Sequence, residues 1–168
     1  NILSAASELA TRRIIQTGPI ARINGYEGDY RYEYGITADA PLRAGTGLYP
    51  HTKFLGHEIA DAFAREAGLD VLTFLVSRLR LRDAFDNRDD NVTISFSTAM
   101  DDLGPAFLKG LQAPPMPRPN ETFYICAELP MGKYDPEKAE RLLGWRARHT
   151  FETFYHRSIL NAEDVQIG

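Results

Sequence analysis

Two side chains able to exchange protons stand four positions apart at the start of a helical pattern, Tyr49 and Lys53. Residues at i and i+4 share one face of an α-helix, so the phenol and the ammonium can converge on one substrate atom. A phenol beside a fixed cation loses its proton more readily than a free phenol does. The pair is therefore suited to moving a proton to or from a sugar or alcohol hydroxyl while a nicotinamide moves a hydride.

The same spacing recurs at Tyr134 and Lys138, but there the surrounding residues give it another meaning. Asp135 is predicted to be a helix N-cap and Pro136 the first helical residue, which leaves Tyr134 outside the helix. For Tyr49 and Lys53 the alternative is an amphipathic helix whose lysine stem packs on apolar surface. The sequence around them favours the catalytic interpretation.

The histidines do not have the spacing of a metal site. His51 and His57 lie six positions apart, whereas a helical zinc site places its histidines at i and i+4. His149 and His156 also lack metal spacing, so we predict no metal. The acidic pair at 101 and 102 is interpreted as capping the following helix, because adjacent helical residues point apart.

The composition excludes several classes of partner. The 168 residues are 43% hydrophobic and 25% charged with a formal net charge of −4, which provides no basic field for nucleic acid. No apolar run approaches the roughly 20 residues that cross a bilayer. Cys126 is the only cysteine and is expected in a buried strand, so no internal disulfide is possible. We expect a protein of a reducing, cytoplasmic compartment.

The order of predicted elements indicates an α/β domain with a mostly parallel sheet. A tyrosine-rich segment, residues 25–35, is expected to be a surface loop or, alternatively, a lid over a ligand. Asp101 or Asp102 should cap the third helix, with Pro105 in its first turn. The predicted helices cover residues 2–10, 49–67, 100–111, 135–143 and a final segment from Phe151, and the predicted strands cover residues 12–16, 69–76, 92–96 and 123–126.

Five segments, in this order and spacing, resemble the NAD-dependent epimerase/dehydratase family of extended short-chain dehydrogenases/reductases. The resemblance runs over almost the whole chain, and Tyr-x-x-x-Lys is its central motif. The segments are Asn1-Ile2-Leu3-Ser4-Ala5-Ala6, Ile36 to Leu42, Tyr49 to Glu58, Met100-Asp101-Asp102-Leu103 and Lys138 to Arg146.

The resemblance implies a partial Rossmann-like fold that binds NAD or NADP, with a small C-terminal α+β lobe for the substrate. Residues 1–90 would be the C-terminal part of the NAD(P)-binding domain, and residues 91–168 a substrate lobe interleaved with it. Tyr49 would be the acid/base, and Lys53 would favour its ionisation and hydrogen-bond the nicotinamide ribose. Arg80 would contact the nicotinamide end. The substrate would be a sugar, free or nucleotide-linked, and the first two predicted helices would form a homodimer interface.

The chain departs from the family's cofactor and catalytic motifs. The Gly-x-x-Gly-x-x-Gly turn that holds the pyrophosphate is absent from these 168 residues. We expect it upstream of Asn1, so that the chain by itself would be inactive. Gly18-Pro19 stands where the family places a Ser or Thr, and Thr17 is the nearest substitute hydroxyl.

The substrate side departs as well. Leu81 takes the place of the family's Asn, and Ser95 that of its phosphate-binding Arg, while Glu128 is expected to keep one acidic substrate contact. Arg78, Arg80 and Arg82 alternate at strand period, which is typical of a solvated edge. Two hypotheses follow: an NAD(P)-dependent epimerase/dehydratase or reductase, or a non-catalytic Rossmann-fold protein that binds a nucleotide or a partner.

Overall fold

The computed structural model describes residues 2–20, 34–81, 96–130 and 132–151. Several expectations fall outside these ranges: the cap at Asn1, most of the tyrosine-rich segment, Arg82, Ser95 and the last predicted helix. None of the helices in the described part of the chain combines the length and hydrophobicity needed to cross a bilayer.

A three-stranded parallel sheet forms the centre of the molecule. Its strands are β1 (Arg13–Pro19), β3 (Asp70–Val76) and β6 (Asn120–Tyr124), in the order β1-β3-β6. Two short parallel pairs accompany it, β2 (Ile36–Thr37) with β7 (Tyr134–Asp135) and β4 (Leu79–Arg80) with β5 (Thr98–Ala99). Every strand pairing in the described residues is parallel, which confirms the predicted sheet type.

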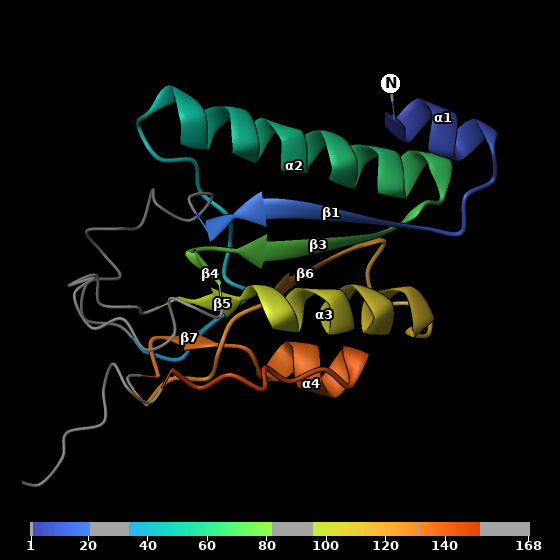
Figure 1. The fold of residues 1–168 in the computed structure, drawn as a ribbon. Coiled ribbons are helices and arrows are strands. Elements are labelled where there is room, and N and C mark those ends of the chain that lie inside the picture. The colour runs from blue at the N-terminus through green and yellow to red at the C-terminus, as the bar shows by residue number, and fades with distance from the viewer. Residues whose placement is uncertain (1, 21–33, 82–95, 131, 152–168) are drawn as a thin grey trace, which may run out of the picture.

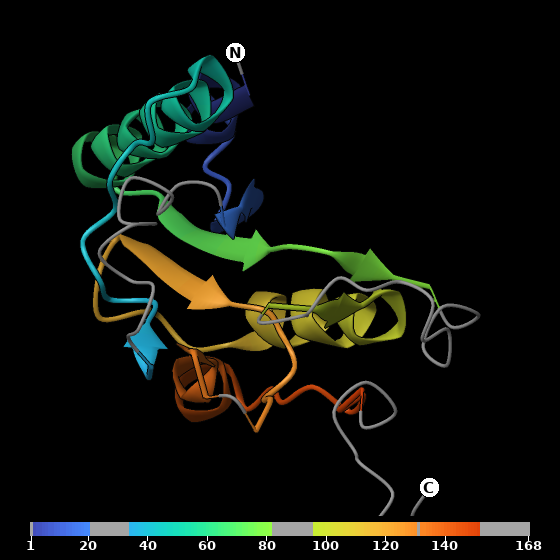
Figure 2. The same ribbon diagram turned by 90° about the vertical axis from the view of Figure 1, so that its left-hand side faces the viewer.

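Helices cover both faces of this sheet, giving three layers (Figures 1 and 2). On one face lie α1 (Ile2–Glu8) and α2 (Leu48–Ala67), and on the other lie α3 (Met100–Gln112) and α4 (Glu137–Leu143). Parallel sheets covered by helices on both faces are typical of α/β folds. The predicted Rossmann-like class is therefore confirmed. The second half of the chain contributes β6 to the main sheet, and the proposed division near residue 90 stays a prediction.

β3, the central strand of the sheet, runs through the hydrophobic core, which is why its sequence is an almost unbroken apolar run. Residues 71–75 of β3 are all buried, as expected for a strand with a helix layer on each side. Phe74 is in edge-on contact with Phe123 of β6 at 5.9 Å between ring centroids and packs on Phe107 of α3 at 5.4 Å. The opposite face of the sheet packs Val71 against Ala64 of α2.

A buried arginine fastens the start of β1 to the end of α3. The Arg13 guanidinium donates hydrogen bonds to the carbonyl oxygens of Gly110 at 2.6 Å, Ala113 at 2.7 Å and Pro114 at 2.7 Å. Carbonyls in the last turn of a helix have no partner within the helix, so a side-chain donor is required when they are buried. Asp70, at the start of β3, holds the same guanidinium through Nε at 2.8 Å. The sequence reasoning missed this clamp.

Several element boundaries differ from the prediction. β1 continues through Gly18 and Pro19, because it is an edge strand of the described sheet, where a proline without an N–H is tolerated. Phe96 lies outside any strand, and the short β5 begins instead at Thr98. β6 begins at Asn120 and ends at Tyr124, so Cys126 is buried, as predicted, but follows the strand.

The beginnings of α3 and α4 test the predicted caps. α3 has Ala99 as its N-cap, so Asp101 and Asp102 lie inside the first turn and the predicted cap is wrong. Because α3 begins at Met100, Pro105 falls in the second turn rather than the first. α4 begins at Glu137 with Pro136 as its N-cap, so the predicted N-cap at Asp135 and the predicted helical start at Pro136 are each one residue too early. The Asp135 carboxylate still accepts a hydrogen bond from the Glu137 N–H at 2.8 Å, because it lies directly before the helix.

Candidate active site

The carboxyl ends of the three parallel strands meet at one edge of the sheet. β1 and β3 point the same way in Figure 1, and α2 and α3 both begin at the edge where these strands end. In open α/β sheets, ligands bind in the crevice outside the carboxyl ends of the strands. This edge is therefore where the candidate residues have to lie if they form a site.

Tyr49 and Lys53 lie in the first two turns of α2, at this edge (Figure 1). The Tyr49 side chain is exposed, and the Lys53 ammonium lies 5.5 Å from the centroid of its ring. Pro50 is tolerated beside Tyr49 because the first turn of a helix requires no N–H from it. The helix thus presents a phenol and an ammonium together on a face that solvent, and hence a ligand, can reach.

Thr17 lies on β1, two residues before the end of the strand, and is exposed. Side chains alternate along a strand, so Thr17 points to the same face as Pro19 and to the opposite face from Gly18. A rise of about 3.3 Å per residue places its hydroxyl roughly 7 Å short of the Pro19 position. Gly18 and Pro19 themselves contribute no hydroxyl to the edge.

Arg80 ends the short strand β4, directly after the loop that follows β3, and pairs in parallel register with Ala99. Its side chain is buried, so the predicted solvated edge is wrong for this residue. Arg78 precedes β4 with a positive φ of 41°, which breaks the expected alternation. Leu81, in the place of the family's Asn, is 64% exposed.

Glu128 follows β6 and lines a cavity of about 490 Å³. Its carboxylate forms an ion pair with the Arg146 guanidinium, and both side chains are exposed at the rim. Cys126 and Tyr134 also line the cavity and belong to an apolar cluster with Ile20, which follows β1, and with Leu75 and Tyr124, which lie at the ends of β3 and β6. The cavity therefore adjoins the carboxyl edge of the sheet.

The Cys126 thiol lies fully buried at the wall of this cavity. Burial in apolar surroundings, together with the nearby Asp135 carboxylate, raises its pKa far above the ordinary value of a thiol. A thiol that does not ionise is a poor nucleophile. Cys126 is therefore a structural residue of the wall.

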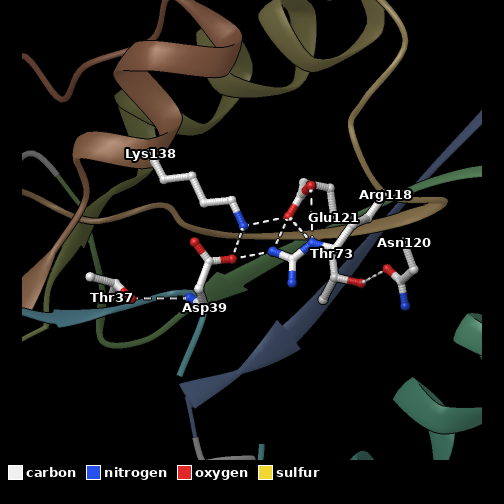
Figure 3. Close-up of polar contacts among 7 residues, drawn as sticks. All are labelled: Thr37, Asp39, Thr73, Arg118, Asn120, Glu121 and Lys138. Atoms are coloured by element: carbon white, nitrogen blue, oxygen red, sulfur yellow. Dashed lines mark hydrogen bonds and ion pairs between the residues drawn. The ribbon is translucent and has the colours of Figure 1, made fainter. Parts of the chain in front are cut away.

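A network of ion pairs that the sequence reasoning missed fixes the segment leading into α2 (Figure 3). The Lys138 ammonium of α4 donates to Asp39 at 2.6 Å and to the buried Glu121 of β6. Arg118 also donates to both carboxylates. No local pattern indicates this network, because Asp39 and Lys138 stand 99 positions apart.

The network also affects Asp39 itself. Partial burial raises the pKa of Asp39, but the hydrogen bonds and charges of Lys138 and Arg118 outweigh burial and hold that pKa below its ordinary value. Asp39 is therefore ionised at neutral pH. It holds the segment before Tyr49 against the sheet.

Asp102 makes long-range contacts that the sequence did not predict, since it was expected only to cap α3. Its buried carboxylate accepts hydrogen bonds from the backbone N–H groups of Arg148 and His149 at 3.2 Å each. The His149 Nδ1 lies 3.1 Å from the same oxygen, and the Trp145 indole donates to the Asp102 carbonyl at 3.2 Å. These contacts fasten the segment after α4 to the start of α3. Trp145 itself packs in the main hydrophobic core.

The donor set at the start of α2 fits one end of a dinucleotide. A phenol and an ammonium are donors suited to ribose hydroxyls, and Tyr49 and Lys53 supply both on one accessible face. A pyrophosphate needs a glycine-rich turn at a helix N-terminus, and the 168-residue sequence contains no such motif. The residues present thus fit the nicotinamide-ribose end only.

Comparisons with known proteins show the fold. No protein-family model matches the chain, and no curated protein matches it either. Solved structures do match, at 12–16% sequence identity, and the chain spans between half and about two thirds of their length.

Three of these structures are similar over nearly the whole of this chain. A short-chain dehydrogenase/reductase superfamily protein from Agrobacterium tumefaciens with bound NAD is 16% identical, with a TM-score of 0.67 over 91% of this chain and 67% of that one. A glucuronic acid dehydrogenase from Chromohalobacter salexigens is 16% identical, with a TM-score of 0.65 over 97% and 58%. A UDP-glucose 4-epimerase from Thermotoga maritima is 12% identical, with a TM-score of 0.65 over 91% and 65%.

Proposed function

We propose that the protein is an NAD(P)-dependent enzyme of the epimerase/dehydratase or reductase type that acts on a sugar, with Tyr49 as its acid/base. The observation that carries the proposal is the placement of Tyr49 and Lys53 together, exposed, at the carboxyl edge of a Rossmann-like sheet. Solved proteins of this fold with bound NAD support it.

The chain's own residues would perform the proton chemistry. When bound, NAD or NADP would supply the acceptor or donor of the hydride. Tyr49 Oη would take the proton of a substrate hydroxyl, and the Lys53 ammonium would stabilise the phenolate that forms. Lys53 and Arg80 would hold the nicotinamide-ribose end. Thr17 would orient the substrate hydroxyl. For this the substrate has to reach the Thr17 hydroxyl, which lies two residues before Pro19 on β1.

The decisive experiment replaces the phenol. Tyr49→Phe in the protein expressed from its complete coding region should lower sugar-dependent turnover of NAD(P) by about 100-fold or more, because general acid–base groups contribute about 10²–10⁴ to a rate. Binding of NAD(P)H, followed by its fluorescence, should persist. Glu66→Gln is the control, since Glu66 is an exposed residue at the other end of the same helix, and it should leave turnover unchanged.

The alternative function is a non-catalytic Rossmann-fold protein that binds a nucleotide or a partner. The strand end without a hydroxyl at Gly18 and Pro19 favours it. Under this alternative the parent protein and Tyr49→Phe behave alike: neither shows sugar-dependent turnover, and both bind the nucleotide or partner equally. Full sugar-dependent turnover in Tyr49→Phe would show that the acid/base assignment is wrong.

We also propose that the protein forms a homodimer through α1 and α2. These two helices lie side by side on one face of the sheet (Figures 1 and 2). They expose large apolar side chains, of which Ile2 is 82% exposed, Leu55 51% and Ile59 52%. Leu55 and Ile59 share one face of α2, and large exposed apolar patches mark protein–protein interaction sites.

A further inference from the structure

The cavity beyond the end of β6 is unusual in its charge. Among the described residues that line it, Arg146 is the only cation, whereas the carboxylates number four: Glu128, Asp135, Glu137 and Glu140. Its volume of about 490 Å³ lies within the range of small-molecule sites.

The single cation of the cavity is already engaged. The Arg146 guanidinium donates to the Glu128 carboxylate, so these two charges offset each other at the rim. Asp135, Glu137 and Glu140 have no cation other than Arg146 among the described residues that line this cavity, and Asp135 and Glu137 also line a smaller cavity that contains Lys138 and Arg141. The lining of the 490 Å³ cavity thus has an excess of negative charge, and a concave surface with such an excess repels anionic ligands.

The other walls of the cavity are those of a binding site rather than of a solvated acidic surface. Trp145, Leu129 and Pro136 contribute apolar area. The Cys126 residue is 1% exposed and lies at the wall of the cavity. Apolar walls with a few polar groups are the usual composition of a small-molecule pocket.

We infer that this cavity is a subsite for a sugar that carries no phosphate or carboxylate group. Hydroxyl groups can donate hydrogen bonds to the carboxylates of Glu137 and Glu140, whereas an anionic ligand would meet like charge without a free guanidinium to bind it. The inference rests on the proposed function and narrows its substrate class. It also separates this chain from similar structures such as the glucuronic acid dehydrogenase and the UDP-glucose 4-epimerase.

Binding of a sugar in this cavity can be measured through Trp145. It is the only tryptophan of the chain and lines the cavity, so its fluorescence reports on ligands bound there. We would titrate the cofactor-free protein at low salt with glucose, glucosamine and glucuronate, which differ chiefly in charge. Glucosamine and glucose should change the fluorescence, and glucuronate should bind about tenfold or more weakly. Raising the ionic strength to about 1 M should reduce this difference, since the Debye length falls to about 3 Å.

A charge-neutral variant tests the origin of the selectivity. Glu140→Gln removes one lining carboxylate and should narrow the ratio of glucose to glucuronate affinity severalfold. Glu66→Gln is the matched control, because it removes the same charge from the exposed end of α2, away from the cavity, and should leave the ratio unchanged.

Two results would overturn the inference: glucuronate binding as tightly as glucose at low salt, or no fluorescence response to any of the three sugars. Neither result depends on Tyr49 or on the cofactor. If either of these results is obtained while Tyr49→Phe loses turnover, the sugar subsite is wrong and the proposed function stands. If glucose and glucosamine bind more tightly than glucuronate while Tyr49→Phe keeps full turnover, the proposed function is wrong and the subsite stands.

Discussion

At the scale of single residues, the structure separates groups that can react from groups that only hold the fold. Tyr49 and Lys53 are accessible at the carboxyl edge, whereas Cys126 and Asp102 are buried and Asp102 is bonded to backbone. Spacing along the helix together with the surrounding sequence predicted the first pair, since spacing alone also selects Tyr134 and Lys138. It could not reveal the role of Asp102, whose partner His149 lies 47 positions away.

The buried thiol gives a prediction at this scale. Because burial and the Asp135 carboxylate raise the pKa of Cys126, the native protein should react with a thiol-specific disulfide reagent at pH 8 about 100-fold more slowly than the denatured protein. The measurement is the rate of release of the coloured thiolate, with the guanidinium-denatured protein as control. Equal rates in the two states would show that Cys126 is accessible in solution.

At the scale of elements, close approach of α3 to the sheet decides which glycines can be replaced. A Cβ on Gly110 would lie 2.8 Å from Phe74 Cζ and 2.9 Å from Ile15 Cδ1, both closer than carbon atoms pack. A Cβ on Gly56, which lies inside α2, would meet nothing within 4 Å. Gly56 therefore serves as the control position for measuring how closely α3 packs on the sheet.

We therefore expect opposite effects from the same substitution. Gly110→Ala should lower the free energy of unfolding by about 1–3 kcal/mol, because an overpacked core must shift. Gly56→Ala should raise it by about 0.5–1 kcal/mol, because alanine loses less conformational entropy in a helix. Urea unfolding followed by circular dichroism measures both. A stabilising Gly110→Ala would mean that α3 lies farther from β1 and β3.

The elements were predictable to different degrees for physical reasons. α2 has a strong apolar periodicity and a glycine at its C-cap, and β3 is an apolar run buried on both faces, so local sequence determines both. The end of β1 was not predictable from Gly18 and Pro19. A proline ends a strand only where its N–H is needed, and that depends on which strands are neighbours. The Arg13 clamp and the Lys138 network connect segments far apart in sequence, so no local pattern contains them.

At the scale of the whole molecule, the helices on both faces of the sheet expose apolar side chains, and the proposed dimer uses those of α1 and α2. The prediction for the dimer uses Ile59, which lies beside Leu55 on the exposed face of α2. Ile59→Glu should convert a dimer into a monomer of 18.9 kDa, as measured by light scattering after size exclusion, since a charge in an apolar interface is costly.

The control for this substitution lies on the other side of the sheet. Leu108 of α3 is 55% exposed, so Leu108→Glu introduces the same charge at a similar exposure and should leave the dimer intact. A monomeric parent chain at tens of micromolar would contradict the proposed interface.

The order of the strands has a consequence for how the chain folds during synthesis. β3 lies between β1 and β6, so its second neighbour is made only after roughly 50 further residues. At about 5–20 residues per second a ribosome needs about 2–10 s to make them. For that time the apolar residues of β3 have one edge without a partner, which is a site for aggregation. A chaperone that holds the nascent chain would have its greatest effect in this interval.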